Sequence, residues 1–446
     1  MRLLANCAAL RQNFSHNHDI AVQHFHSRIH ASGGAPISTR HDTMKLLTFS
    51  TLYPNSQQPN HGIFVETRLR YLIASGQVES RVVAPVPWFP LKGERFGHYG
   101  TLAKVPRRET RNGIDVTHPR YLVLPRVGMN VTPYTLAHAA KKEIGRILDS
   151  GYDFDAIDAH YFYPDGVAAV MLGKYFNKPV VITARGTDIN LIPQFARPRQ
   201  LILDAARDAD GIITVCKALK DEMVGLGVAP DNITPLRNGV DLERFAPIDR
   251  AAARAAVGLA PGRFTLLSVG LLDPRKAHDL IIRALPQLPD VDLLIAGIGP
   301  EKNNLERLAR ELNVQDRVKL LGSVPQTELK TYYNAADTLV LASSREGWAN
   351  VLLESMACGT PVVASNVWGT PEVVAAPEAG VLMKERTSAG IAEAVDRLRA
   401  SYPDHAATRR YAEGFSWDAT TEGQLKLFSS IIDKTAFRPA QQRAAA

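Results

Sequence analysis

Short apolar runs alternate with helix-length segments along most of the chain, beginning at Met44. This alternation predicts βαβ units and parallel sheets. The predicted strands of the first half are 45–51, 79–84, 155–160, 179–184 and 211–215; those of the second half are 264–270, 291–297, 318–322, 337–343, 360–365 and 379–383. Each set is enough for one doubly wound sheet, so the pattern predicts an α/β protein with two Rossmann-like domains in tandem.

The same pattern predicts where the domains begin and end. We expect one domain over 44–235 and a second over 236–410, with 245–263 as a surface excursion at the start of the second. A helical pattern over 411–432 is expected to return to the first domain, and 433–446 to form a tail. Residues 1–43 show no strand or helix period, which indicates a disordered extension or a misassigned start.

Composition narrows the class of protein. The 446 residues are 45% apolar and 22% charged, which is typical of a globular enzyme. No stretch approaches the roughly 20 apolar residues of a membrane span. Cys7, Cys216 and Cys358 are too few and too scattered for a disulfide framework, which favours a reducing compartment such as the cytoplasm.

The net charge of +7 is uneven. Residues 44–215 contain 21 Lys and Arg against 15 Asp and Glu, whereas 216–446 contain 27 against 28. The basic residues gather at Arg107, Arg108 and Arg111, at Lys141 and Lys142, and at Arg197 and Arg199. This favours an anionic membrane surface or a pyrophosphate-bearing acceptor, with an ordinary solvated surface as the alternative. We expect peripheral membrane association without a hydrophobic anchor, and no nucleic acid, since stacking aromatics are not interleaved.

The clearest chemical motif spans residues 343–354. A predicted strand ends, a short loop contains Glu346 and Gly347, and a helix begins near Asn350, a favourable N-cap residue. Its first turn has no acidic side chain, so its N–H groups are expected to be free to receive a diphosphate. Glu346 would then lie beside the sugar, and Glu354 would reach ribose hydroxyls. The alternative is an ordinary strand–loop–helix with two solvent-facing glutamates.

This run resembles the E-x7-E signature of retaining glycosyltransferase family 4, the group 1 glycosyltransferases. The block 54–65, with the Arg-Gly-Thr-Asp run at 185–188, resembles the members that build bacterial surface polysaccharides. Further blocks of the family occur in order at 238–241 with Arg244 and Phe245, 269–272 with Lys276, 296–301, 359–364, 369–372 and 415–418. The resemblance covers about 44–432. It implies the GT-B fold, in which two Rossmann-like domains face a cleft.

The resemblance also implies roles for individual residues. Lys276 would stabilise the departing diphosphate and Glu346 the transferred sugar. The arginine usual near position 271 is replaced by Leu271, and the adjacent Arg275 is a candidate substitute. The remaining donor contacts are expected at Glu354, Gly347, Trp348, Ala349, Asn350, Val351, Leu352, Gly270, Gly297, Gly299, Val324 and Gly62.

The first domain is expected to hold the acceptor. Many relatives have a histidine after the strand that ends in Thr183, but this chain has Arg185, which becomes a candidate catalytic, acceptor or phosphate contact. His160 and Asp188 are further candidates on the acceptor side. For His160 a purely structural role is an equal alternative.

The expected reaction moves a sugar from a UDP- or GDP-sugar to a hydroxyl with retention of configuration. We expect no cofactor and no metal, because helix N-termini and a lysine suffice for the diphosphate and Asp153-Phe154-Asp155 precedes its strand. The acceptor would be a saccharide, lipid-linked through undecaprenyl pyrophosphate, reached in the cytoplasm or on the inner face of the membrane.

Two other functions share this architecture: a nucleotide-sugar 2-epimerase and a non-catalytic sugar-nucleotide-binding protein. Lys276, Glu346 and Glu354 together argue against the second. A dinucleotide dehydrogenase is disfavoured because no G-x-G-x-x-G follows the first strand of either half.

Overall fold

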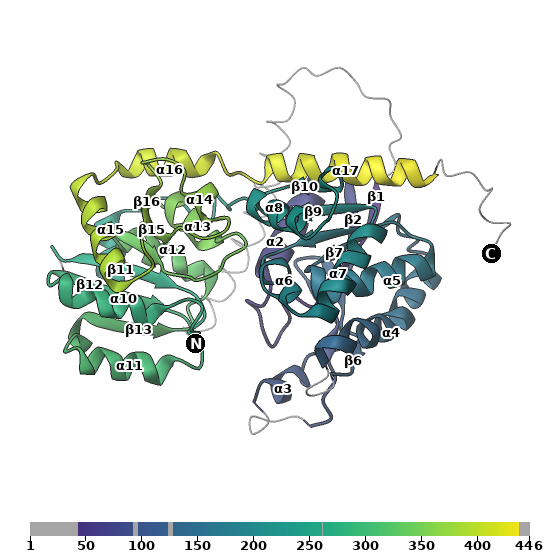
Figure 1. Cartoon of the computed structure of the whole chain (residues 1–446), viewed down its shortest axis with the longest axis horizontal. Helices are drawn as coiled ribbons and strands as arrows, with labels where there is room; N and C mark the ends of the chain where they lie inside the picture. The colour runs from purple at the N-terminus through teal and green to yellow at the C-terminus, as the bar shows by residue number, and fades with distance from the viewer. Residues whose placement is uncertain (1–42, 92–96, 124–127, 261, 437–446) are drawn as a thin grey trace, which may run out of the picture. The chain divides into compact units, whose positions relative to one another are not determined.

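The computed structural model describes residues 43–91, 97–123, 128–260 and 262–436 (Figure 1). Its first sheet has eight strands in the order β10-β9-β8-β7-β1-β2-β5-β4, parallel except for the antiparallel pair of β4 and β5. The strands are β1 (Met44–Phe49), β2 (Val78–Val83), β4 (Arg108–Arg111), β5 (Ile114–Thr117), β7 (Ala156–His160), β8 (Val180–Ala184), β9 (Gly211–Thr214) and β10 (Ile233–Pro235).

Helices connect these strands and cover the sheet. They are α2 (Ile63–Ala74), α3 (Gly97–Leu102), α4 (Gly128–Asp149), α5 (Val167–Phe176), α6 (Thr187–Asn190), α7 (Ala196–Asp208) and α8 (Lys217–Gly225). A separate parallel pair, β3 (Val86–Pro87) and β6 (Arg120–Tyr121), lies between α3 and the start of α4. The strands β1, β7 and β8 are apolar at most positions because both faces of the sheet are covered.

The second sheet has six parallel strands in the order β13-β12-β11-β14-β15-β16. They are β11 (Phe264–Val269), β12 (Val291–Ala296), β13 (Val318–Gly322), β14 (Thr338–Leu341), β15 (Val362–Ser365) and β16 (Gly380–Met383). Their helices are α9 (Arg250–Ala256), α10 (His278–Ala284), α11 (Lys302–Glu311), α12 (Gln326–Ala335), α13 (Asn350–Ala357), α14 (Thr370–Val373), α15 (Ser388–Ala400) and α16 (His405–Glu413).

The last helix, α17 (Asp418–Ala436), packs against the first sheet. Its Phe428 and Ile431 share a core cluster with Leu46, Val181 and Ile213. The helix includes 433–436, the first residues of the predicted tail, and the rest of that tail, 437–446, lies outside the described residues. None of the helices in the described ranges combines the length and apolar character of a membrane span.

The eleven strands predicted from the apolar pattern all occur, within two residues at each end. Five further strands, β3, β4, β5, β6 and β10, were not predicted; three of them have only two or three residues, and β4 and β5 are partly exposed strands without a continuous apolar run. The expected surface excursion over 245–263 instead contains α9, capped by Asp249, whose side chain accepts from Ala252 N. Cys216 and Cys358 are buried. Residues 1–42, including Cys7, lie outside the described residues.

Candidate active site

The order of the strands in the second sheet predicts where a ligand binds. The chain runs outward from β11 to β12 and β13, then returns to begin again at β14 on the other side of β11. The loops that follow β11 and β14 therefore diverge, leaving a crevice at the carboxyl ends of these neighbouring strands. Those loops contain Arg275 and Lys276 on one side and Glu346 on the other.

The structure brings these three side chains together. Lys276 Nζ donates to Glu346 Oε1 at 2.6 Å, and Arg275 Nη1 lies 3.8 Å from the same oxygen. Both side chains of the Lys276–Glu346 pair are largely buried, at 13% and 9% exposure. Because a backbone bond from Ser344 N to Arg275 O (2.9 Å) joins the two loops, this cluster is held in place. It presents two cations and one carboxylate to the crevice.

Helix α13 begins at Asn350, so Ala349 is its N-cap and the prediction that Asn350 caps the helix is wrong. Asn350 Oδ1 instead accepts from Asn238 Nδ2 at 3.2 Å. The first turn contains no acidic residue, as expected. Asn350 N and Leu352 N, however, already donate to Trp348 O and Ala349 O, so fewer amides are free for a diphosphate than the sequence suggested. A bound diphosphate would therefore depend more on the cationic side chains of Lys276 and Arg275.

Glu354 lies one turn into α13 in a polar setting that the sequence did not reveal. Tyr333 of α12 donates its hydroxyl to Glu354 Oε2 at 2.8 Å, and the Tyr333 ring is fully buried. Burial raises the pKa of Glu354, while hydrogen bonds from Tyr333 and Gln326 lower it. Gln326 in turn accepts from Arg244 at 2.7 Å. Tyr333 and Gln326 belong to no motif, so only the fold shows that they orient this carboxylate.

We expect Glu354→Ala to weaken the binding of a free nucleoside diphosphate. Loss of a charge-assisted hydrogen bond to ribose costs about 1.5–3 kcal/mol, which is roughly a 10- to 150-fold loss of affinity. Tyr333→Phe, which keeps the carboxylate and removes only its partner, should cost less. Calorimetric titration with UDP and GDP measures both, and an unchanged affinity in Glu354→Ala would remove Glu354 from the nucleotide site.

Close backbone packing at the ends of β11, β12 and β13 shapes the rest of the crevice. A Cβ at Gly297 would meet Gly270 O at 1.8 Å, and one at Gly299 would meet Leu272 O at 2.4 Å, so neither position admits a side chain. Leu271, which replaces the family's arginine, is 56% exposed beside Ile298 at 58%. Val324 follows β13 and packs partly against the core. The crevice therefore has an apolar edge where the family has a cation.

The loop 343–349 also touches the first half of the chain. A Cβ at Gly347 would meet Arg185 O at 1.9 Å, and one at Gly186 would meet Gly347 backbone atoms at 3.0 Å. Trp348 is buried against Phe415. The loop that carries Glu346 thus abuts the segment after β8, so both halves of the chain contribute to one site.

In the first sheet, the strand order reverses between β1 and β7. Gly62, which precedes α2, lies in the loop after β1 with a φ of 66°, and a Cβ there would meet Leu52 O at 2.2 Å. Asp165 follows β7 and accepts from Thr51 N at 2.7 Å. A hydrogen bond thus joins the loops that follow β1 and β7 at the switch point of the first sheet, where ligands bind in folds of this kind.

Arg185 is buried in a network that links the two halves. Its Nη2 donates to His160 Nδ1 at 2.8 Å and its Nη1 to Asn238 Oδ1 at 3.1 Å. Asn238 also accepts from Arg68 at 3.4 Å and connects to Asn350 at the start of α13. Burial and the neighbouring Arg68 lower the pKa of Arg185 to about 9. The network therefore connects Arg185, through Asn238, to Asn350 at the start of α13.

The three candidate acceptor residues offer little surface in this conformation: His160 is 1% exposed, Arg185 8% and Asp188 0%. Asp188 accepts from Phe162 N at 2.6 Å, Gly186 N at 2.6 Å and Arg185 N at 3.1 Å. Its carboxylate therefore fixes the turn that carries Arg185. Direct acceptor contact by these residues stays a prediction.

The same network predicts a pH effect on stability. Burial, with Arg185 nearby, lowers the pKa of His160 from 6.5 to about 4. Between these values the unfolded chain binds a proton that the folded chain refuses, so His160 contributes stability that is lost as pH falls from about 6.5 to about 4. His278 acts in the same direction, whereas the pKa of about 7 for buried Asp165 acts in the opposite one.

We therefore expect the unfolding free energy of His160→Gln, relative to wild type, to improve as pH is lowered through this window. Urea titrations of both proteins at several pH values measure the difference. A difference that does not change with pH would mean that the pKa of His160 is the same in the folded and unfolded chain.

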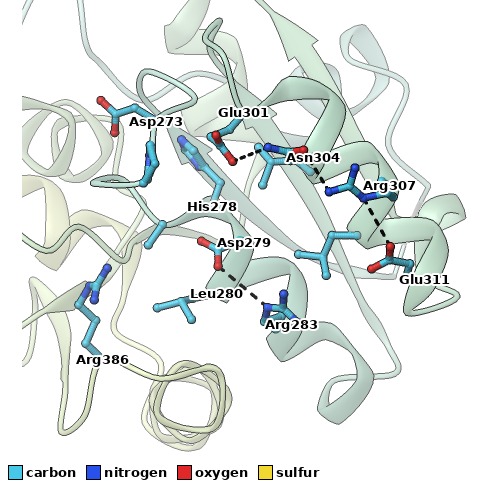
Figure 2. A pocket seen from close by; sticks show the side chains of 14 residues that line it. Asp273, His278, Asp279, Leu280, Arg283, Glu301, Asn304, Arg307, Glu311 and Arg386 are labelled. Atoms are coloured by element: carbon cyan, nitrogen blue, oxygen red, sulfur yellow. Dashed lines mark hydrogen bonds and ion pairs between the residues drawn. The ribbon is translucent and has the colours of Figure 1, made fainter.

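A cavity of about 470 Å³ lies between α10 and α11, beside the loop that carries Arg275 and Lys276 (Figure 2). Its wall mixes acids such as Asp273, Asp279 and Glu301 with Arg283 and Arg307. Figure 2 shows Glu301, Asn304, Arg307 and Glu311 linked in a chain of contacts along α11. None of the predicted donor or acceptor residues lines this cavity.

Carboxylates of the D-x-D sequence have protein partners. Lys178 Nζ lies 2.6 Å from Asp153, and Asp155 accepts from Lys45 N at 2.8 Å. Within the described residues, no group of three or more His, Cys, Asp and Glu side chains is placed to hold a metal ion. The expectation of a metal-independent reaction stays a prediction.

Two Rossmann-like domains, with a Lys–Glu pair at the switch point of the second, agree with the GT-B fold. Residues 249–415 match Glycosyl transferases group 1, and residues 100–244 match Glycosyltransferase Family 4. The chain belongs to the GT-B glycosyltransferases, which transfer a sugar from a nucleotide sugar.

Curated relatives of this chain include D-inositol 3-phosphate glycosyltransferases. The chain is 32% identical over 303 residues to the D-inositol 3-phosphate glycosyltransferase of Mycobacteroides abscessus, covering 64% of this chain and 68% of that one. It is 36% identical over 259 residues to D-inositol 3-phosphate glycosyltransferase 2 of Catenulispora acidiphila, covering 53% and 59%. D-inositol 3-phosphate is the substrate that the names of these relatives give.

Solved structures agree on the fold. Sucrose-phosphate synthase from Thermosynechococcus elongatus matches with a TM-score of 0.71 and 22% identity over 88% of this chain and 100% of that one. Anabaena HepE in complex with UDP-glucose matches with a TM-score of 0.66 and 18% identity over 87% and 99%. The predicted GT-B fold is confirmed.

Proposed function

We propose that this enzyme transfers the sugar of a UDP- or GDP-sugar to a hydroxyl of a lipid-linked saccharide, with retention of the donor's configuration, in the synthesis of a surface polysaccharide. The cluster of Lys276, Arg275 and Glu346 at the switch point carries the proposal. Lys276 and Arg275 would bind the diphosphate, and Glu346 would lie against the sugar.

The proposed step breaks the bond between the sugar's anomeric carbon and the β-phosphate oxygen and forms a bond from that carbon to the acceptor oxygen. The acceptor's proton passes to the departing diphosphate. Retention follows if the acceptor enters on the face from which the diphosphate leaves, with positioning and charge stabilisation supplying most of the rate. Two cations beside one carboxylate suit that ion-pair-like arrangement and require neither a cofactor nor a metal.

The basic first half supports an anionic acceptor, since residues 44–215 contain 21 Lys and Arg but only 15 Asp and Glu. A pyrophosphate-linked saccharide at the cytoplasmic face of the membrane meets this requirement. The names of the relatives favour a second candidate, a phosphorylated polyol such as D-inositol 3-phosphate. Both candidates place negative charge near the same half of the chain.

Parallel incubations test the proposal. Full-length enzyme with UDP- or GDP-sugars should form product with undecaprenyl-pyrophosphate-linked saccharide and little with D-inositol 3-phosphate. Product from the phosphorylated polyol alone would replace the first acceptor by the second. Conversion of the donor's sugar to its C2 epimer without any acceptor would instead identify an epimerase.

A further inference from the structure

Exposed apolar side chains gather in one part of the first half. Among the described residues, twelve large apolar side chains are exposed, and six of them fall between residues 88 and 134. We call these six the apolar surface: Trp88, Leu91, Tyr99, Leu122, Met129 and Tyr134, each 43–51% exposed. Single exposed apolar residues are ordinary, but a concentration of this kind indicates an interaction site.

Bonds between the elements bring the β3, β6 and α4 parts of this surface together. The register of β3 and β6 pairs Pro87 with Tyr121, and Trp88 N donates to Tyr121 O at 2.7 Å, so Trp88 and Leu122 emerge side by side. Thr135 of α4 donates to Leu122 O at 2.8 Å, next to Tyr134. Figure 1 shows β6 beside α4, and α3 in turn contacts β3.

The α3 segment joins the same surface. Tyr99 lies against Phe89, with ring centroids 5.7 Å apart. Beneath them, Val86, Leu102 and Val105 form a small core of their own, apart from the main sheet. Arg120 ties this core together by donating to the carbonyls of Leu102 and Val105. The apolar surface therefore rests on a small packed unit.

Exposed basic residues adjoin this surface in the described part of the chain. Lys104 and Arg107 follow α3, are exposed, and take part in no ion pair within the described part of the chain. Arg197, also exposed, donates to Tyr134 Oη at 3.2 Å. Glu66 binds Arg111 at 3.1 Å and the Arg111 side chain is 19% exposed, so we leave Arg111 out of the proposed contact. Arg108 is likewise engaged by Glu143 at 2.7 Å.

We propose that the apolar surface docks the enzyme on an anionic lipid bilayer. Trp88, Leu122 and Met129 enter the interfacial region, and Lys104, Arg107 and Arg197 meet the headgroups. Trp and Tyr favour this region because one end of each ring system is apolar and the other polar. Apolar side chains are thus part of the contact, contrary to the expectation of purely electrostatic attraction.

A second copy of the chain fits this surface less well. A symmetric dimer brings the same patch of both copies face to face, so the surrounding cations would lie opposite one another. An anionic bilayer neutralises these cations, and each well-placed Lys or Arg adds about fivefold to the affinity at low salt.

Vesicle flotation of the full-length protein tests the proposal. Vesicles of phosphatidylcholine alone are compared with vesicles of equal parts phosphatidylcholine and phosphatidylglycerol, at low and high salt. We expect binding to the anionic vesicles only, weakened by salt. Trp88→Ser with Leu122→Ser should reduce it about tenfold or more, and Lys104→Ser with Arg107→Ser roughly 30-fold.

Matched controls are Val224→Ser with Ile248→Ser for the apolar pair and Arg410→Ser with Lys426→Ser for the basic pair; all four residues are exposed and lie elsewhere. These should bind vesicles like wild type. Wild-type indifference to anionic vesicles at low salt would overturn the proposal, and so would a change from dimer to monomer in Trp88→Ser with Leu122→Ser. UDP affinity of the same variants reports on the donor site separately.

Discussion

Glu346→Gln is expected to lose turnover by about 100- to 1,000-fold while keeping its affinity for free UDP or GDP. The amide keeps the shape of the side chain but removes the charge that would face the developing positive charge on the sugar. Free nucleotide lacks that sugar. In addition, the substitution releases Lys276 Nζ from its 2.6 Å contact, so diphosphate affinity should hold or improve.

Steady-state rates and calorimetric titrations separate the two effects. Glu328→Gln, an exposed glutamate on α12 in the same half, serves as the matched control and should change neither quantity. Equal losses of turnover and of nucleotide affinity in Glu346→Gln would contradict the placing of this carboxylate beside the sugar.

Lys276→Ala should lose both diphosphate affinity and turnover, the latter by about 100- to 1,000-fold. The ammonium group would stabilise the charge that builds on the departing diphosphate. Because the contact is to phosphate, the loss should appear with UDP or GDP and vanish with uridine or guanosine. Arg275→Ala should show a smaller loss of the same kind, since Arg275 lies 3.8 Å from the Glu346 oxygen that Lys276 contacts at 2.6 Å.

Titrations with nucleosides and with nucleoside diphosphates measure this difference directly. If Lys276→Ala weakened nucleoside and nucleoside diphosphate equally, Lys276 would belong to the base or ribose site. If it changed only stability, its pair with Glu346 would be structural.

Much of the fold could be predicted because its strands are buried on both faces and stand out as apolar runs. Strands such as β7 and β8 are uniformly buried, so their sequences alone give their positions. Strands β3 and β6, two residues each, depend on pairing across more than 30 residues and carry no such signal. The apolar surface, which includes residues next to these two strands, was missed for the same reason.

The candidate site was predictable where a residue acts through its place in a loop. Glu346 and Lys276 follow strands whose carboxyl ends meet, so their approach could be expected. Arg185 could not be placed in this way, because its environment comes from α2, β7 and the segment after β10: Arg68, His160 and Asn238 surround it. Side-chain networks that join distant segments emerge only with the tertiary structure.

The stereochemistry of donor turnover tests the central claim most directly. Time-resolved NMR of the anomeric proton during consumption of an α-linked UDP- or GDP-sugar shows the configuration of the first product formed. Substitution with retention, as proposed for this enzyme, predicts that this product is α. A β product at its first appearance would contradict substitution with retention at this site.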